Sequence, residues 1–258
     1  MKQFQLKAGV KENIEVCPGV FRLTFISREI AGTAGPGQFL MVRVARPPAI
    51  EPVLRRPFSI HRIDDEQVSI LFKVVGRGTE ILSREINEID LLGPLGNGYT
   101  IPAQGNLALI GGGLGIAPLL FLAQRCQQQE RAGQLLILLG AGTATDMPAI
   151  DDFRQLGLPV KLATDDGSAG HHGFVPELMA DNMEKGDWSV MTCGPQPMMA
   201  GVARQCAANG WQCQVSLETT MACGMGACLG CAVQGRSRES YLHVCKDGPV
   251  FAAEDVVF

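Results

Sequence analysis

Four cysteines near the end of the chain are the residues best suited to chemistry. Cys223 and Cys228 are separated by four residues, Cys228 and Cys231 by two, and Cys245 follows at a greater distance. This is the plant-type spacing for four thiolate ligands of a [2Fe–2S] cluster. A structural zinc site or unrelated thiols are the alternatives, but zinc motifs usually repeat the C-x2-C pair, and only one such pair occurs here. The spacing therefore predicts an iron–sulfur site.

A glycine-rich turn in the middle of the chain has the form of a phosphate-binding loop. The apolar run Leu107–Ile110 leads into Gly111–Pro118, in which three consecutive glycines are followed closely by a fourth. Amide groups and the dipole at the start of a following helix suit a pyrophosphate. Ile116 stands where the usual dinucleotide fingerprint needs its last glycine. A glycine turn that serves only packing is the alternative.

The third candidate lies earlier, in residues 54–60. Arg56 is suited to grip a diphosphate, Pro57 stiffens the entry to a strand, and Ser59 can hydrogen-bond a ring nitrogen. The turn Gly76–Thr79 is a second phosphate-contacting candidate. Two arginines before a strand are by themselves typical of a solvated edge. This motif therefore supports a cofactor site only in combination with the cysteine and glycine motifs.

The arginine motif lies within residues 1–102, which must fold so as to position it. The sequence pattern of this segment is typical of β-structure. Short alternating or apolar runs occur at Val20–Phe25, Gln38–Val44 and Gln67–Val75, with glycine and proline between them. The segment contains no pattern typical of a long helix. It therefore predicts a small antiparallel barrel or sandwich.

Residues 103–216 alternate between strands and helices, which predicts a doubly wound parallel sheet. Helices are expected at about Met147–Leu156, with Asp146 as N-cap, and at Gln196–Ala208. The expected buried strands are Leu107–Ile110, Leu135–Leu139, Pro159–Ala163, Ser189–Thr192 and Gln212–Leu217. Residues 217–258 form a third segment, rich in cysteine and glycine and too short for a core of its own.

Composition limits the classes of protein that remain. With 258 residues, 46% of them hydrophobic and 19% charged, the chain is typical of a soluble globular protein of two domains and a small appendage. The net charge of −4 does not indicate the basic surface that is typical of nucleic-acid-binding proteins. The apolar stretch Leu107–Ala123 is interrupted by glycines, so it does not predict a membrane span. The first residues lack a signal-peptide core, and a cytoplasmic location is expected.

The order of these motifs resembles a known superfamily. An Arg-x-aromatic-Ser motif in an N-terminal β-domain, then Gly113–Pro118, then Cys193-Gly-Pro195, is similar to the ferredoxin–NADP reductase superfamily over about the first 215 residues. The resemblance implies a barrel that holds FAD and an α/β domain that holds a nicotinamide nucleotide. It also implies that Cys193, treated as the catalytic residue, lies where nicotinamide meets flavin. A small buried residue at a strand end is the alternative for Cys193.

The cysteine motif narrows the resemblance to the electron-transfer subunits of class B dihydroorotate dehydrogenase. This family implies that residues 1–102 bind FAD, 103–216 bind NAD and 217–258 bind the [2Fe–2S] cluster through Cys223, Cys228, Cys231 and Cys245. The cofactor-binding residues implied are Arg56, Pro57, Phe58, Ser59, Lys73, Val74, Val75, Gly78, Thr79, Gly112, Gly113 and Gly115.

The same resemblance implies the role and the partner. The chain is expected to pass electrons from a separate FMN-containing catalytic subunit through the cluster and FAD to NAD+, in pyrimidine (UMP) biosynthesis. The family assembly is a heterotetramer of two subunits of each kind. NAD is expected over NADP because the loop Gly140–Asp146 lacks a basic residue and ends in an acid. Glu218 precedes the cluster motif, and the sequence leaves open whether it lies near the flavin.

Three other functions share some of these parts. A reductase subunit of a hydrogenase, a sulfide dehydrogenase or a bifurcating transhydrogenase combines the same modules, although some of these subunits have Asp as the first cluster ligand, where this chain has Cys223. An autonomous ferredoxin or flavodoxin reductase is a second alternative. A zinc-stabilised nucleotide-binding regulator, which would be colourless, is the third.

Overall fold

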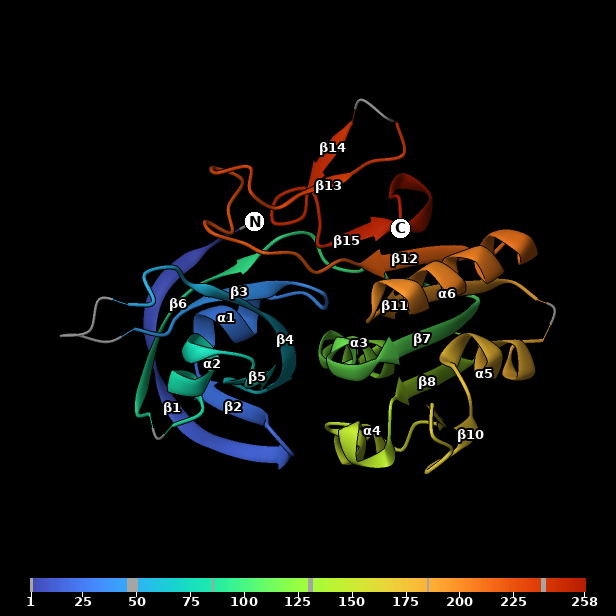
Figure 1. Cartoon of the computed structure of the whole chain (residues 1–258), viewed down its shortest axis with the longest axis horizontal. Helices are drawn as coiled ribbons and strands as arrows, with labels where there is room; N and C mark the ends of the chain where they lie inside the picture. The colour runs from blue at the N-terminus through green and yellow to red at the C-terminus, as the bar shows by residue number, and fades with distance from the viewer. Residues whose placement is uncertain (1, 46–50, 85, 130–131, 185, 238–239) are drawn as a thin grey trace.

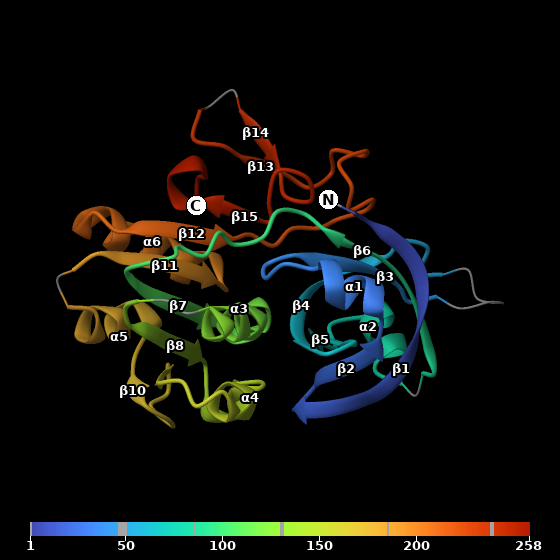
Figure 2. The same ribbon diagram turned by 180° about the vertical axis from the view of Figure 1, so that it is seen from behind.

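The computed structural model describes residues 2–45, 51–84, 86–129, 132–184, 186–237 and 240–258. It has three parts: a barrel, an α/β domain beside it, and a C-terminal segment that lies over the junction of the two (Figures 1 and 2). The expected fold class, a β-barrel followed by a doubly wound sheet and a cysteine-rich segment, is confirmed.

The N-terminal part is a closed antiparallel barrel in the order β1-β2-β5-β4-β3-β6. Its elements are β1 (Phe4–Cys17), β2 (Val20–Ile26), α1 (Arg28–Thr33), β3 (Phe39–Arg43), β4 (Arg56–Asp64), β5 (Gln67–Lys73), α2 (Arg77–Leu82) and β6 (Glu88–Leu95). Inward-facing apolar residues such as Leu23, Phe25 and Ile70 are fully buried and fill the barrel. The two helices have six residues each, so the expectation of no long helix is confirmed. Closing the barrel leaves no free sheet edge.

The second part is a seven-stranded sheet in the order β10-β9-β8-β7-β11-β12-β15. Its strands are β7 (Asn106–Gly112), β8 (Leu135–Ala141), β9 (Val160–Thr164), β10 (His171–His172), β11 (Trp188–Cys193), β12 (Gln212–Ser216) and β15 (Val250–Ala252). All neighbours are parallel except β12 and β15, which are antiparallel. The chain reverses its direction of winding between β7 and β11. Open sheets of this kind bind ligands at the carboxyl ends of the strands beside such a switch point.

Helices cover both faces of this sheet. They are η1 (Gly113–Ile116), α3 (Ala117–Gln128), η2 (Ala144–Asp146), α4 (Ile150–Gln155), α5 (Val175–Asn182) and α6 (Gln196–Asn209). The expected helix at 147–156 begins later, because Ala149 takes a left-handed conformation with φ 56° and Asp146 belongs to a separate 3-10 turn. No helix among the described residues is long and apolar enough to cross a membrane.

The C-terminal segment packs on both larger parts. It contains β13 (Ala232–Gln234), β14 (Tyr241–His243) and η3 (Ala253–Asp255), and it contributes β15 to the edge of the α/β sheet. Its buried side chains Met221 and Val244 share one apolar cluster with Met41 of the barrel and Val215 of β12. The segment thus buries its apolar side chains against the two larger parts, as expected for a segment too short to form a core of its own.

A buried carboxylate on α4 ties the barrel to the α/β domain. Asp152 is 7% exposed, and both of its oxygens lie 2.9 Å from Nη1 of Arg22 on β2. Arg62 Nη1 lies 3.2 Å from one of these oxygens. His61 is fully buried, with Nδ1 2.8 Å from the carbonyl oxygen of Ala117. Burial raises the pKa of Asp152, but His61 and Arg22 lower it overall.

We expect Asp152→Asn to destabilise the protein at neutral pH by about 3 kcal/mol, since two arginines lose a buried anion. A carboxyl with a lowered pKa stabilises the fold above its unfolded pKa, and this stabilisation is lost as the pH falls through the folded pKa. The difference between variant and wild type should therefore shrink below about pH 4. Urea unfolding across this pH range measures it. Asp151→Asn is the control, because Asp151 is exposed and pairs with Arg154 at the surface.

Candidate functional site

The four cysteines of the C-terminal segment form two pairs. Sγ of Cys231 lies 3.2 Å from Sγ of Cys245, and the Cys228 N–H donates to Sγ of Cys223 at 3.4 Å. Among the described residues, no three His, Cys, Asp or Glu side chains converge closely enough to hold one metal ion. Two thiol pairs are the arrangement that a two-iron cluster needs, since each iron takes two thiolates.

Backbone amides surround these sulfurs. The Met225 N–H donates to Sγ of Cys223 at 3.4 Å, and the Gly226 N–H to Sγ of Cys245 at 3.1 Å. Although burial raises the pKa of Cys223, hydrogen bonds from the loop lower it to about 6. A Cβ on Gly224 would lie 2.5 Å from Cγ of Met41, so the loop sits directly on the barrel. Donors aimed at thiolates fit the residues to an iron–sulfur cluster.

A cavity of about 350 Å³ lies between the barrel and the chain that follows β12. Its barrel wall includes six of the residues predicted to bind FAD, namely Pro57, Phe58, Ser59, Lys73, Val75 and Thr79. Phe58 packs on Phe72 with ring centroids 5.7 Å apart. The opposite wall is Ser216–Thr219 with Leu114 and Ala117. Aromatic and apolar surface with a few polar groups fits a flavin ring.

The other predicted FAD residues lie next to this cavity. The Arg56 guanidinium donates to the carbonyl of Leu54 at 2.8 Å. Gly78 packs against the same side chain, since a Cβ added at Gly78 would lie 3.3 Å from Nε of Arg56. Val74 packs against the barrel core. In the turn before α2, the Thr79 hydroxyl accepts the N–H groups of Val75 and Gly76 at 2.9 and 3.2 Å. The Gly76 amide, part of the turn predicted to contact a phosphate, is thus occupied by the turn itself.

The glycine loop after β7 separates two further cavities, of about 640 and 410 Å³. Gly112 and Gly113 line both, and Gly115 lines the larger. A Cβ on Gly112 would lie 2.5 Å from Sδ of Met198, and one on Gly115 would lie 2.4 Å from Cα of Gly194. Packing against the backbone of β11 and Gly194 therefore requires a glycine at 115, whereas a side chain at 112 would force the Met198 side chain to move. Gly113 has φ 55° and would place a Cβ in open space, which suits the approach of a phosphate.

Cys193 lies beneath this loop rather than in a cavity wall. It ends β11, in register with Gly111 on one side and Ser216 on the other, and it is 1% exposed. Burial, with the charge of Glu218, raises its pKa far above the usual range. The Tyr99 hydroxyl donates to the carbonyl of Thr192 at 3.1 Å beside it. This thiol is therefore a neutral group under the point where the cavities meet.

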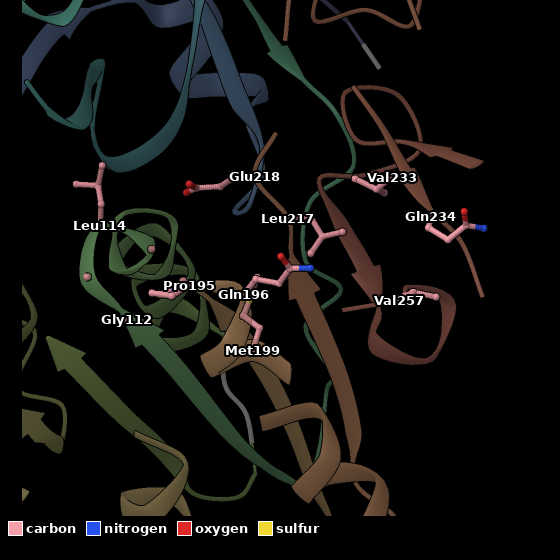
Figure 3. A pocket seen from close by; sticks show the side chains of 13 residues that line it. Gly112, Leu114, Pro195, Gln196, Met199, Leu217, Glu218, Val233, Gln234 and Val257 are labelled. Carbon is pink, nitrogen blue, oxygen red and sulfur yellow. The ribbon is translucent and has the colours of Figure 1, made fainter. Parts of the chain in front are cut away.

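The 350 Å³ cavity, called the flavin cavity below, and the 640 Å³ cavity, called the larger nucleotide cavity, share one wall. Leu114, Leu217 and Glu218 line both, and in Figure 3 the Glu218 carboxylate points away from Gln196, toward the side on which Leu114 lies. Sequence reasoning did not assign Glu218, because its place between two cavities depends on tertiary packing.

Sequence reasoning also missed two residues that line the 410 Å³ cavity. They are Asp165, after β9, and Phe174, which precedes α5 and is 61% exposed. A strand-end acid and an aromatic residue after Gly173 were the available signals.

This fold and site define a reductase with a flavin barrel, a dinucleotide-binding sheet and an iron–sulfur segment. Residues 218–257 match the iron–sulfur cluster binding domain of dihydroorotate dehydrogenase B, and residues 109–204 match the oxidoreductase NAD-binding domain. The structure is similar to that of an NADH-dependent reduced ferredoxin–NADP oxidoreductase, with TM-score 0.85 and 29% identity over 97% of this chain and 89% of the other. The FAD/NAD-binding domain of nitric oxide dioxygenase from Vibrio cholerae, at TM-score 0.66 and 18% identity over 81% and 97%, shares the fold.

Within this class the chain belongs to the electron transfer subunits of dihydroorotate dehydrogenase B (NAD(+)). It is 40% identical to the subunit of Desulforamulus reducens over 94% of each chain. It is 38% identical to that of Caldanaerobacter subterraneus subsp. tengcongensis over 99% of this chain and the whole of the relative. The expected cofactors, FAD, a [2Fe–2S] cluster and NAD, agree with these comparisons.

We expect Cys228→Ser to abolish the cluster, because one iron loses a thiolate ligand. Electron paramagnetic resonance of the dithionite-reduced protein, with iron and sulfide analysis, measures this. Cys17→Ser is the control, since Cys17 lies in β1, far along the chain from the cluster loop, and it should keep the full signal. A Cys228→Ser protein that retains the rhombic signal would contradict the ligand assignment.

We expect Arg56→Ala to weaken FAD binding by about 10- to 100-fold, the size of one or two charge-assisted hydrogen bonds. Flavin content after extensive dialysis, and fluorescence titration of the apoprotein, measure the loss. Arg84→Ala is the control, because Arg84 is exposed and pairs with Glu80 on the same barrel. Equal flavin retention in both variants would remove Arg56 from the site.

Proposed function

We propose that this chain carries electrons from an FMN-containing dihydroorotate dehydrogenase subunit to NAD+, by way of its [2Fe–2S] cluster and FAD, in pyrimidine biosynthesis. The observation that carries the proposal is the short segment 216–223. Ser216–Thr219 and Met221 line the flavin cavity, Leu217 and Glu218 also line the larger nucleotide cavity, and Cys223 lies in the cluster loop. The names of the relatives support dihydroorotate dehydrogenase as the partner.

Each part of the chain has a task in this function. When bound, FAD and the cluster supply the exchange between the paired electrons of a nicotinamide and the single electrons of iron. Pro57, Phe58 and Ser59 would hold the flavin against the barrel, and Cys193 would lie buried beneath the place where nicotinamide meets it. Gly113 faces the pyrophosphate of the nucleotide. The backbone N–H groups of the cluster loop donate hydrogen bonds that stabilise the negative charge of the thiolates.

The cluster loop also offers the surface for the partner. Cys228 is exposed, and so are three large apolar side chains of the same segment: Met225 at 50%, Leu229 at 58% and Tyr241 at 64%. Exposed apolar groups beside a redox group suit a protein interface. We place the catalytic subunit here, in an assembly of two subunits of each kind in the cytoplasm. The three-part division of the chain at 102 and 216 is part of the same proposal.

A second function uses the same parts with another partner. The similarity to the NADH-dependent reduced ferredoxin–NADP oxidoreductase, a flavin-based electron-bifurcating enzyme, favours it over an autonomous reductase. Cys223 as first ligand and the higher identity to the dihydroorotate dehydrogenase subunits favour the first proposal.

Anaerobic titration of the purified chain with NADH tests the proposal. We expect the flavin absorbance to bleach and the reduced-cluster signal to appear in electron paramagnetic resonance, with NADPH at least tenfold less effective because the loop 140–146 offers no cation for its phosphate. Addition of the catalytic subunit and orotate should then reoxidise the chain. A protein that binds one zinc and no flavin would exclude the proposal, and a reduced chain that orotate cannot reoxidise would favour the second function.

A further inference from the structure

His61 is a fully buried polar residue that the electron path does not use. It lies on β4, the strand that carries the flavin residues. In the ladder between β4 and β5, Ile60 pairs with Ile70 and Arg62 pairs with Ser69. His61 is therefore the extra residue of a β-bulge, a feature that can turn a side chain out of the regular alternation of a strand. Here the ring reaches the α/β domain.

The imidazole contacts the first residue of α3. Nδ1 of His61 lies 2.8 Å from the carbonyl oxygen of Ala117. Because a carbonyl oxygen can only accept, Nδ1 carries the hydrogen of this bond. Nε2 lies 3.7 Å from Oδ2 of Asp152, beyond hydrogen-bond range, and has no hydrogen-bond partner among the residues that the structure describes. The specific contact of the ring is therefore the one with Ala117.

Ala117 lies where the two cofactor sites meet. It lines the flavin cavity, as does Ser59 on β4. Its N–H donates to the carbonyl of Leu114 in η1, and Gly113 and Leu114 of this turn line the larger nucleotide cavity. Ala117 thus closes the glycine loop, and His61 holds the carbonyl of Ala117 from the flavin strand.

A second polar contact joins the same helix and strand away from the loop. Gln124, in the C-terminal half of α3, is 8% exposed. Its side-chain amide donates to Asp64 at 3.1 Å, and its Oε1 accepts the N–H of Ile63 at 3.3 Å. Gln124 therefore attaches α3 to β4 as His61 does, but at the other end of the helix from the glycine loop.

We propose that His61 is a positioning residue for the glycine loop and that it couples nucleotide binding to FAD binding. The inference rests on the proposed function, in which FAD packs on Ser59 and the pyrophosphate of NAD lies at the loop. Bound FAD restrains β4, and the hydrogen bond from His61 to Ala117 transmits this restraint to the loop. A loop already held in its binding conformation costs less to order when the nucleotide arrives. Since coupling between two sites is reciprocal, the nucleotide in turn strengthens the binding of FAD.

ADP-ribose is the probe for this coupling, because it has the pyrophosphate of NAD but no nicotinamide to stack on the flavin. Isothermal titration calorimetry of the FAD-loaded chain measures its binding. His61→Asn keeps an N–H donor near the place of Nδ1, whereas His61→Gln places its donor near Nε2, toward Asp152. We expect His61→Gln and His61→Leu to bind ADP-ribose about tenfold more weakly than wild type, the effect of one hydrogen bond. His61→Asn should recover most of this loss, and Gln124→Leu, the control, should bind like wild type.

Two further readouts separate positioning from a general loss of structure. In stopped-flow reduction of the flavin, His61→Gln should raise the NADH concentration for the half-maximal rate by about tenfold. The limiting rate should stay unchanged, because His61 lines neither cavity. In fluorescence titration of the wild-type apoprotein, saturating ADP-ribose should strengthen FAD binding by the same factor. This strengthening should be absent in His61→Gln.

Two results would overturn the role of His61. One is wild-type affinity for ADP-ribose in His61→Gln, and the other is equal weakening in His61→Asn, His61→Gln and Gln124→Leu. A wild-type chain that binds no ADP-ribose and that NADH cannot reduce would instead overturn the proposed function.

Discussion

The short chain between β12 and the cluster loop is the constraint on which the rest of the structure depends. Ser216 ends a strand of the dinucleotide sheet, Glu218 lies between two cavities, Met221 is buried against the barrel, and Cys223 begins the cluster loop. Because so few residues join these points, the three sites cannot move independently. Electron transfer needs short and constant distances, and a short covalent connection, anchored by the buried Ser216 and Met221, supplies them.

This connection works only if the barrel and the α/β domain keep a fixed relation. The ion cluster around Asp152 holds α4 to β2 and β4, and His61 reaches the first residue of α3. On the same helix, the Gln124 amide donates to Asp64 at 3.1 Å. These polar contacts lie away from the cluster segment, so the two domains are joined at both ends of their junction. The flavin cavity lies between these two attachments and has walls from both domains.

The sequence predicts the local motifs of this structure well and the contacts between them poorly. The cysteine spacing and the glycine turn each place their groups within one loop, so their chemistry can be inferred without the fold. The start of α4 was wrong because nothing local reveals the left-handed Ala149. Glu218 could not be assigned, since β12, the barrel and the glycine loop create its surroundings together. The glycines themselves were ambiguous for the same reason, because Met198 and Gly194 decide which of them serve packing.

The antiparallel strand β15 has a consequence for how the protein is made. It covers the outer edge of β12 through the pairs Gln214–Ala252, Val215–Phe251 and Ser216–Val250. Until β15 has left the ribosome and paired, the backbone N–H and C=O groups on this edge of β12 remain open to pairing with another chain. The cysteine loop precedes β15, so it must leave the ribosome first. The cluster ligands are therefore synthesised before the strand that covers the edge of the sheet.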